Sequence, residues 1–333
     1  MRSFMSLQSR KPEGNVPRGF TIIELACSLA IVSIIALVAT SVYSSLLKSL
    51  TKTRMSAGLS QRAQSVVTFL SREAAVIGGA DLPAQFALSV DNDSCVAVGA
   101  IPACDAGTDR LSWLEVDISV PAGIIAAITA TSITGQSGAA CSLSGFYANR
   151  FVALMKGNAV ALVDAGNFAG CDLSIACVPF GLNDCTNLDA FVGGTAMVVN
   201  RKALFQADHD LMLTFFNRPP LDIPAAMADP MIVSRSVFDF QVAVGLLPAD
   251  QTQPLIESAS GAGDSWIFNS PGETLSVAGR NRSSAIQFDI VVGVPVRFRE
   301  LASVTNARGN TITERGVRMT AVRGRVALRN RLF

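Results

Sequence analysis

The segment Arg18-Gly19-Phe20-Thr21-Ile22-Ile23-Glu24-Leu25 opens a long apolar run and decides how the rest of the chain is interpreted. No charged residue follows Glu24 until Lys48. The run 25–47 has 23 residues, about 35 Å of helix at ~1.5 Å per residue, which is enough to cross a bilayer core of about 30 Å. We therefore expect a membrane-spanning helix with a carboxylate at its edge, where an ionisable group requires a functional partner.

Glu24 admits three interpretations. Thr21 and Glu24 have the Thr-x-x-Glu spacing of a capping box, in which the two side chains satisfy backbone N–H groups at a helix start. Glu24 can also be the membrane-edge residue of an ordinary signal anchor. In the third interpretation, cleavage after Gly19 creates an α-amine on Phe20 that is largely cationic at neutral pH. Glu24 of one subunit can then pair with that cation on a neighbouring subunit.

The stretch Gly19-Phe20-Thr21-Ile22-Ile23-Glu24-Leu25 resembles the type IV prepilin signature, with a short basic leader, Gly before the cleavage point and Glu as the fifth mature residue. In that family a membrane peptidase cleaves after the Gly and methylates the new N-terminal Phe. The mature subunits then pack into a filament through their apolar helices. By position, the resemblance implies cleavage between Gly19 and Phe20, N-methylation of Phe20 and an assembly role for Glu24.

The charges that flank the span indicate its orientation. Four cations and one acid precede the span and three cations follow it: Arg2, Arg10, Lys11, Glu13 and Arg18, then Lys48, Lys52 and Arg54. This modest excess favours a cytoplasmic leader and a body outside the cytoplasm. A secretory signal peptide fits less well, because its apolar core has only about 7–15 residues. A lipoprotein site at Cys27 is disfavoured because the apolar segment follows that cysteine.

Cysteine usage also indicates an extracytoplasmic body. Besides Cys27, six cysteines lie within one 91-residue stretch: Cys95, Cys104, Cys141, Cys171, Cys177 and Cys185. The chain has no Cys-x-x-Cys pair and a single His, so the spacing of a zinc site is absent. An even number of cysteines in an oxidising compartment favours disulfides. Six cysteines allow 15 pairings, among which Cys95–Cys104 and Cys177–Cys185 would close short loops.

The helix is expected to continue beyond the membrane, because no Pro occurs between Phe20 and Leu82. Apolar residues then recur at helical spacing: Leu59, Ala63, Val66, Leu70, Ala74 and Ile77. They define one face that a sheet could cover. Gly58 is a candidate bend, since Gly in a helix interior costs about 1 kcal/mol relative to Ala. Gly78-Gly79 predicts the end of the helix.

Beyond the helix, short apolar segments broken by Gly, Pro and Asn predict strands. The candidates are Leu111–Val120, Phe151–Val163, Thr195–Asn200, Leu211–Phe216, Ser234–Val244, Ala285–Val292, Val294–Phe298 and Val317–Leu328. Loops rich in Ser, Gly and Ala are expected over residues 121–145 and 258–284. Charge is unevenly distributed, because residues 81–279 carry a net −13 and residues 280–333 a net +8. The two parts could attract each other or neighbouring subunits.

Three later stretches resemble the large PilW-type minor pilins. They are Phe69–Glu73 followed by Gly78-Gly79, Ser234–Val242, and Arg325–Arg331. The resemblance implies an α+β fold, in which a long N-terminal helix with a transmembrane first half packs on an antiparallel β-sheet body. It implies a minor pilin that acts in type IV pilus assembly or initiation. The alternatives are a minor pseudopilin of a type II secretion system and a pilus-associated adhesin or DNA-uptake subunit.

The resemblance also implies partners and a location. The partners are prepilin peptidase, other major and minor pilins, the inner-membrane pilus assembly machinery and, before assembly, the lipid bilayer. The location is the bacterial inner membrane, with a cytoplasmic N-terminus and a periplasmic body, and later the extracellular filament. We expect a cleaved leader over residues 1–19, a helix over 20–80 and a β-rich, disulfide-bonded region over 81–333.

The sequence contains no convincing catalytic constellation. His209, in Asp208-His209-Asp210, is the only His, so a histidine-based triad or a multi-histidine metal site is excluded. Asp91-Asn92-Asp93-Ser94 begins like a calcium loop but lacks the later Gly and the bidentate Glu. An exposed strand face explains the alternating Arg residues near the C-terminus better than binding to DNA phosphates does. We therefore expect no enzymatic activity and no cofactor.

Overall fold

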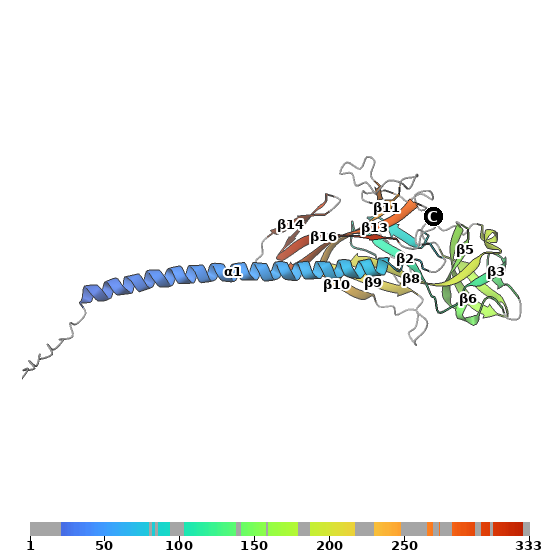
Figure 1. The fold of residues 1–333 in the computed structure, drawn as a ribbon, viewed down its shortest axis with the longest axis horizontal. Coiled ribbons are helices and arrows are strands. Elements are labelled where there is room, and N and C mark those ends of the chain that lie inside the picture. The colour runs from blue at the N-terminus through green and yellow to red at the C-terminus, as the bar shows by residue number, and fades with distance from the viewer. Residues whose placement is uncertain are drawn as a thin grey trace, which may run out of the picture. The chain divides into compact units, whose positions relative to one another are not determined.

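A computed structural model of the chain provides the fold (Figure 1). It describes residues 21–79, 82–83, 86–93, 103–137, 141–157, 159–178, 187–216, 230–247, 265–268, 273, 282–296, 301–306 and 309–328. The chain divides into two units, residues 1–56 and 57–333. The first unit contains the N-terminal part of one long helix, and the second contains the rest of that helix and all the strands found in the described ranges.

The helix α1 spans Ile22–Ala74. Its N-terminal part is apolar, and every residue from Thr21 to Arg54 is exposed in the single chain. Ser and Thr hydroxyls in this part donate to carbonyl oxygens one turn earlier, as Ser33 does to Leu29 at 2.7 Å. This bonding leaves few hydroxyl protons unsatisfied in an apolar environment. The helix is long and apolar enough to cross a membrane.

The C-terminal part of α1 buries the apolar face that the periodicity predicts. The buried side chains are Leu59, Ala63, Val66, Leu70 and Ala74. The helix ends at Ala74, four residues before the predicted stop. Gly78 is no longer helical, with a φ of 76°. Its N–H donates to the Leu114 carbonyl at 2.7 Å, and its carbonyl accepts from the Val116 N–H at 2.9 Å. Pairing of the backbone with a strand therefore ends the helix early.

One antiparallel sheet packs against the buried apolar face of α1. Its strands follow the order β1 (Leu88–Asp91), β2 (Arg110–Val116), β8 (Thr195–Ala207), β9 (Asp210–Phe216) and β10 (Met231–Arg235). Asp208 and His209 form the two-residue turn between β8 and β9, with φ angles of 52° and 60°, as a type I′ hairpin requires. The Asp105 carboxylate accepts both turn N–H groups, at 3.0 and 3.1 Å.

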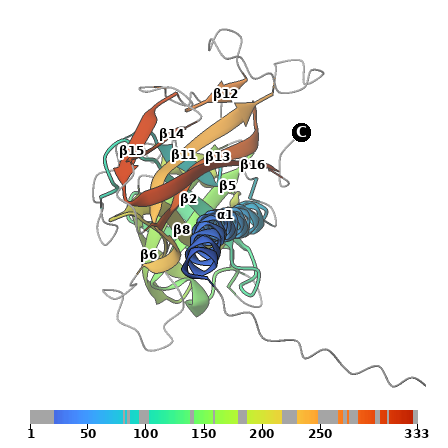
Figure 2. The same ribbon diagram turned by 90° about the vertical axis from the view of Figure 1, so that its left-hand side faces the viewer.

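A second antiparallel sheet contributes to the same apolar core. Its order is β12 (Trp266–Ile267), β11 (Val237–Leu246), β13 (Ser283–Pro295) and β16 (Val317–Ala327), and β14 (Leu301–Thr305) pairs with β15 (Thr311–Arg315) in a separate hairpin. Phe240 and Phe288 stack with ring centroids 6.4 Å apart. Both sheets and the C-terminal part of α1 contribute to one apolar core, and Figure 2 shows the helix beside β13 and β16.

A closed barrel is inserted between β2 and the second half of β8. Its strands are β3 (Gly123–Ile128), β4 (Ser132–Gly135), β5 (Arg150–Lys156), β6 (Ala159–Ala169), β7 (Asp172–Cys177) and the first half of β8. Their pairings close a ring in the order β8-β3-β4-β7-β6-β5-β8. The short helices η1 (Gly145–Tyr147) and η2 (Leu188–Phe191) add Tyr147 and Phe191 to a core separate from that of the sheets.

Several expected boundaries are wrong. Residues 121–145, expected to be a loop, contain β3 and β4. Their small residues fit tight barrel packing, because a Cβ at Gly123 would lie 2.6 Å from Leu143 Cδ2 and one at Gly135 would lie 2.9 Å from Leu143 Cγ. The single strand expected over residues 151–163 is a hairpin that turns at Gly157, where φ is 57°. Most of 258–284, the other expected loop, lies outside the described residues.

The predicted fold class is confirmed. One long apolar N-terminal helix accompanies a large antiparallel β body, as an α+β pilin-like fold requires. Two expected strands, residues 285–292 and 294–298, belong to a single strand as far as Pro295, the last paired residue of β13. A Pro is tolerated there because the next residue makes the bond to the facing chain: the Val296 N–H donates to the Gly316 carbonyl at 2.8 Å.

Candidate assembly site

The start of α1 forms a capping box within one chain. The Thr21 N–H donates to Glu24 Oε2 at 3.0 Å, and the Glu24 N–H donates to Thr21 Oγ1 at 3.2 Å. The Thr21 hydroxyl donates to the same carboxylate oxygen at 3.0 Å. These bonds satisfy N–H groups that no helical carbonyl reaches. The geometry therefore realises the capping interpretation in the isolated chain.

Glu24 is the only acid in the exposed, apolar part of α1, residues 22–54. The flanking side chains of Ile22, Ile23 and Leu25 are 87%, 75% and 56% exposed. Within the described residues, the first cation after Glu24 is Lys48, and the carboxylate has no ion pair. Hydrogen bonds from Thr21 leave the negative charge in place. A partner subunit that buries this surface must therefore supply a cation or leave the charge uncompensated.

Gly19 and Phe20, the predicted cleavage and methylation residues, lie outside the described part of the chain. Phe20 is bonded directly to Thr21, so the Cα atoms of these two residues lie about 3.8 Å apart. An amine created on Phe20 would therefore be one residue from the N–H group that contacts Glu24. Cleavage and the role of Phe20 remain predictions.

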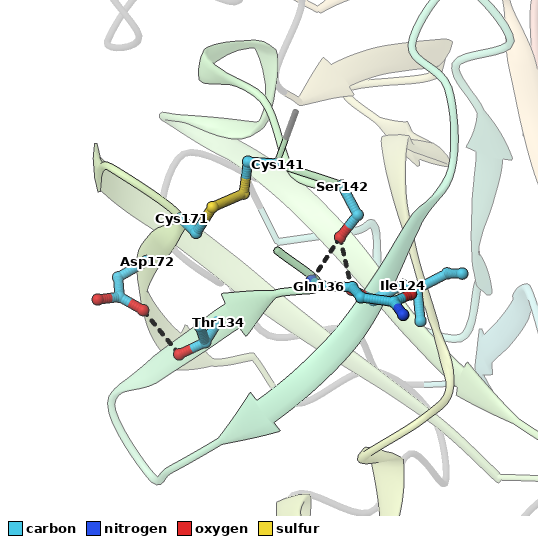
Figure 3. The surroundings of a disulfide bond; sticks show 7 residues. All are labelled: Ile124, Thr134, Gln136, Cys141, Ser142, Cys171 and Asp172. Atoms are coloured by element: carbon cyan, nitrogen blue, oxygen red, sulfur yellow. Dashed lines mark hydrogen bonds between the residues drawn. A yellow bond between two sulfur atoms is a disulfide. The ribbon is translucent and has the colours of Figure 1, made fainter. Parts of the chain in front are cut away.

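Four of the described cysteines are disulfide-bonded, and one is free. Cys141 and Cys171 form a disulfide with a Cα–Cα distance of 5.6 Å, joining the segment that follows β4 to the start of β7 (Figure 3). Beside it, Ser142 Oγ donates to the Ile124 carbonyl and accepts from the Gln136 N–H, both at 2.7 Å. Cys104 and Cys177 are disulfide-bonded as well. Cys95 and Cys185 lie outside the described residues, and Cys27 is free and exposed.

We expect the Cys141–Cys171 bond to stabilise the barrel substantially. The two cysteines are 30 residues apart, and closing such a loop in the unfolded chain is worth about 3–4 kcal/mol in the chain-entropy treatment. The double variant Cys141→Ser, Cys171→Ser should lower the free energy of unfolding by about that amount, measured by chemical denaturation under oxidising conditions. A variant with Cys27→Ser is the matched control and should leave this free energy unchanged. A loss below about 1 kcal/mol would contradict the expectation.

Sequence reasoning missed the ion pairs that anchor the end of α1. Lys202 on β8 lies 3.0 Å from Glu73 on α1 and 2.7 Å from Glu115 on β2. Burial lowers the pKa of Lys202, but the hydrogen bonds and charges of Glu115 and Glu73 outweigh it and raise this pKa overall. Lys202 and Glu73 are 129 positions apart, so no local pattern could have paired them.

The Arg-rich C-terminal region uses part of its charge internally. Arg323 lies 2.7 Å from Asp289, and Arg325 donates to Gln287 Oε1 at 2.7 Å while lying 5.1 Å from the centre of the Trp266 ring. These contacts join β16 to its neighbour β13 and to β12. They account for two alternating Arg residues without a nucleic acid.

The structure places His209 in the exposed turn between β8 and β9, where its ring lies 5.0 Å from that of Phe238. Asp91, the first residue of the calcium-like stretch, pairs with Arg110 at 2.6 Å. Over the described ranges, no group of three or more His, Cys, Asp and Glu residues has an arrangement that could hold a metal ion. These residues therefore have structural contacts in the fold.

Comparison with known proteins places the similarity at the N-terminus. Residues 15–40 match a family model described as the prokaryotic N-terminal methylation motif. No curated protein and no solved structure matches the chain. The motif implies processing by a prepilin peptidase and assembly with pilin partners. Together with the long apolar helix, it indicates a membrane-anchored protein of the type IV pilin or pseudopilin type.

Proposed function

We propose that this protein is a minor pilin that takes part in assembly or initiation of a type IV pilus. The observation that carries the proposal is the methylation motif over residues 15–40, which overlaps a charge-free helical segment over residues 25–47 whose side chains are all exposed. Such a surface is unstable in water and requires either lipid or other apolar helices. A pilin uses both in turn, first in the bilayer and then in the filament.

The proposed mechanism begins with cleavage between Gly19 and Phe20 and methylation of the new amine. Glu24 then pairs with the Phe20 cation of a neighbouring subunit while the apolar parts of α1 pack together. Pairing removes two uncompensated charges from an apolar phase, where each charge is costly. The body of residues 57–333 remains outside the apolar phase. The protein has no catalytic role in this scheme and needs no cofactor.

A minor rather than a major subunit is supported by the body. Two sheets and an inserted barrel follow the helix, and a head of this size is best accommodated where few copies are present, as at a filament tip. The stretches that resemble PilW-type pilins include structurally important residues. Leu70 is 1% exposed in the core, Glu73 pairs with Lys202, and Arg325 binds β13 through Gln287. The proposed location is the inner membrane, with a periplasmic body, and after assembly the pilus.

Mass spectrometry of the mature N-terminus tests the proposal. The chain recovered from membranes and filaments is expected to begin at methylated Phe20. Replacing Gly19 with a bulky residue should leave the leader attached and keep the chain out of filaments, whereas a Ser6→Ala change in the leader should alter neither. An intact leader in assembled filaments, or a mature N-terminus elsewhere in the apolar segment, would refute the processing scheme.

A minor pseudopilin of a type II secretion system is the second candidate, because the same N-terminal motif serves that machine. Deleting the gene separates the two. Loss of surface pili with normal protein secretion supports the pilin, and the reverse pattern supports the pseudopilin.

A further inference from the structure

The indole N–H of Trp113 is a buried donor that no acceptor reaches. Trp113 lies on β2 and is 1% exposed, and its Nε1 has no hydrogen-bond partner among the residues that the structure describes. An indole N–H can only donate, and leaving a buried donor without an acceptor is costly enough that native proteins usually avoid it. The surroundings of this side chain should therefore supply an acceptor.

A cavity of about 10 Å³ lies beside Trp113, between the end of α1 and both sheets. The side chains that line it are apolar or aromatic, except for that of Glu73. This volume is about the least that one water molecule requires. The cavity is therefore too small for an organic ligand, and a water molecule there needs polar partners.

The fold holds the Glu73 carboxylate next to the Trp113 indole. Trp113 and Lys202 are directly opposite each other in the ladder between β2 and β8, so their side chains project from the same face of the sheet. Lys202 Nζ lies 3.0 Å from Glu73 Oε2. Glu115 contacts the same ammonium group at 2.7 Å but is not among the residues that line the cavity. Of these two acids, only Glu73 can accept a bond from inside it.

The end of α1 supplies a second acceptor. Ala74, the last residue of the helix, also lines the cavity. Its carbonyl accepts the Ile77 N–H at 3.4 Å, which is longer than the usual range of about 2.7–3.2 Å. A carbonyl oxygen has two lone pairs, so this group retains the capacity for a further hydrogen bond.

We propose that the cavity is a binding site for one structural water molecule, which accepts from Trp113 Nε1–H and donates to the Glu73 carboxylate and the Ala74 carbonyl. Three hydrogen bonds are about the number that a buried water molecule makes. The water joins the last turn of α1 to β2, beside the ion pair that joins the same turn to β8. The site lies in the body and does not depend on the proposed function.

Nuclear magnetic resonance of the full chain in detergent micelles tests the site. Tryptophan labelled with ¹⁵N at the indole gives two indole signals, because the chain has two Trp residues, and the variant Trp266→Phe assigns them. We expect a nuclear Overhauser effect between water and the Trp113 indole proton, with opposite signs in the laboratory and rotating frames. Opposite signs identify a bound water molecule, whereas proton exchange with the solvent gives equal signs.

Glu73→Met and Glu115→Met form a matched pair, because both acids contact Lys202 but only Glu73 lines the cavity. Methionine keeps most of the volume of glutamate and removes the carboxylate. The Overhauser effect should be lost in Glu73→Met and kept in Glu115→Met. Absence of the effect in the unaltered chain would show a dry cavity and overturn the proposal without any variant. An effect that survives Glu73→Met, or that is lost equally in both variants, would overturn the bridging role of Glu73.

Discussion

Replacing Glu24 with glutamine is expected to leave the chain cleaved and folded but largely absent from filaments. Glutamine can take the place of glutamate in a capping box, so the start of α1 keeps its bonds to Thr21. The negative charge is lost, and the Phe20 amine of the neighbouring subunit then remains unpaired in an apolar phase. Breaking a buried pair in this way costs about 3–5 kcal/mol, which corresponds to a loss of incorporation of more than about 100-fold.

The measurement compares the amount of this protein in sheared filaments with that in membranes. Thr21→Ala is the complementary variant, because it removes the cap but keeps the carboxylate. A lost cap costs about 1 kcal/mol, so its effect on incorporation should be at most about tenfold. If Glu24→Gln assembled normally and Thr21→Ala did not, capping would be the whole role of the pair, and the intersubunit role of Glu24 would be wrong.

Replacing Phe288 with alanine is expected to destabilise the body more than any other single change considered. Phe288 lies on β13, is 1% exposed and stacks on Phe240. With Leu70, Trp113 and Leu204 it lines a small space between α1 and the two sheets. Truncating a buried Phe costs about 3–5 kcal/mol through lost burial and the cavity left behind. Chemical denaturation should show this loss as a lower midpoint.

Phe146→Ala is the control for that experiment. Phe146 lies on η1 and is 69% exposed, so its removal should change the free energy of unfolding by no more than about 0.5 kcal/mol. Hydrogen exchange adds a second test, because the barrel has a core of its own. Amides of β4 and β7, whose buried apolar residues belong to the barrel core alone, should keep more protection in Phe288→Ala than those of β11 and β13. Equal loss of protection in both regions would show that the two cores unfold as one.

The sequence was most informative where a signal is local. The prepilin-like start and the spacing of Leu59, Ala63, Val66 and Leu70 depend on neighbours within one or two turns, so the helix and its buried face were predictable. The capping bonds between Thr21 and Glu24 were also visible in the spacing of two residues. The position of the exposed apolar part of α1 was predictable from the charge-free run over residues 25–47.

The barrel was not predictable in the same way. Its strands β3 and β4 are short and rich in small residues, which single-sequence patterns assign to loops. The ring closes through pairs such as Gly123–Ala196, which lie far apart in the sequence and have no local signature. The disulfide between Cys141 and Cys171 is likewise one of many allowed pairings. Lys202 and its two acids are a third such case, because tertiary contact alone brings them together.

The strand β8 has a mechanical consequence. Its residues 195–199 pair with β5 in the barrel, and residues 199–207 pair with β2 and β9 in the open sheet. Tension applied to the barrel therefore enters the open sheet along one continuous backbone, as shear on the ladders that flank β8. Ladders loaded in shear break many hydrogen bonds together instead of one after another. The barrel and the open sheet thus share one strand, and Lys202 on that strand also pairs with Glu73 of α1.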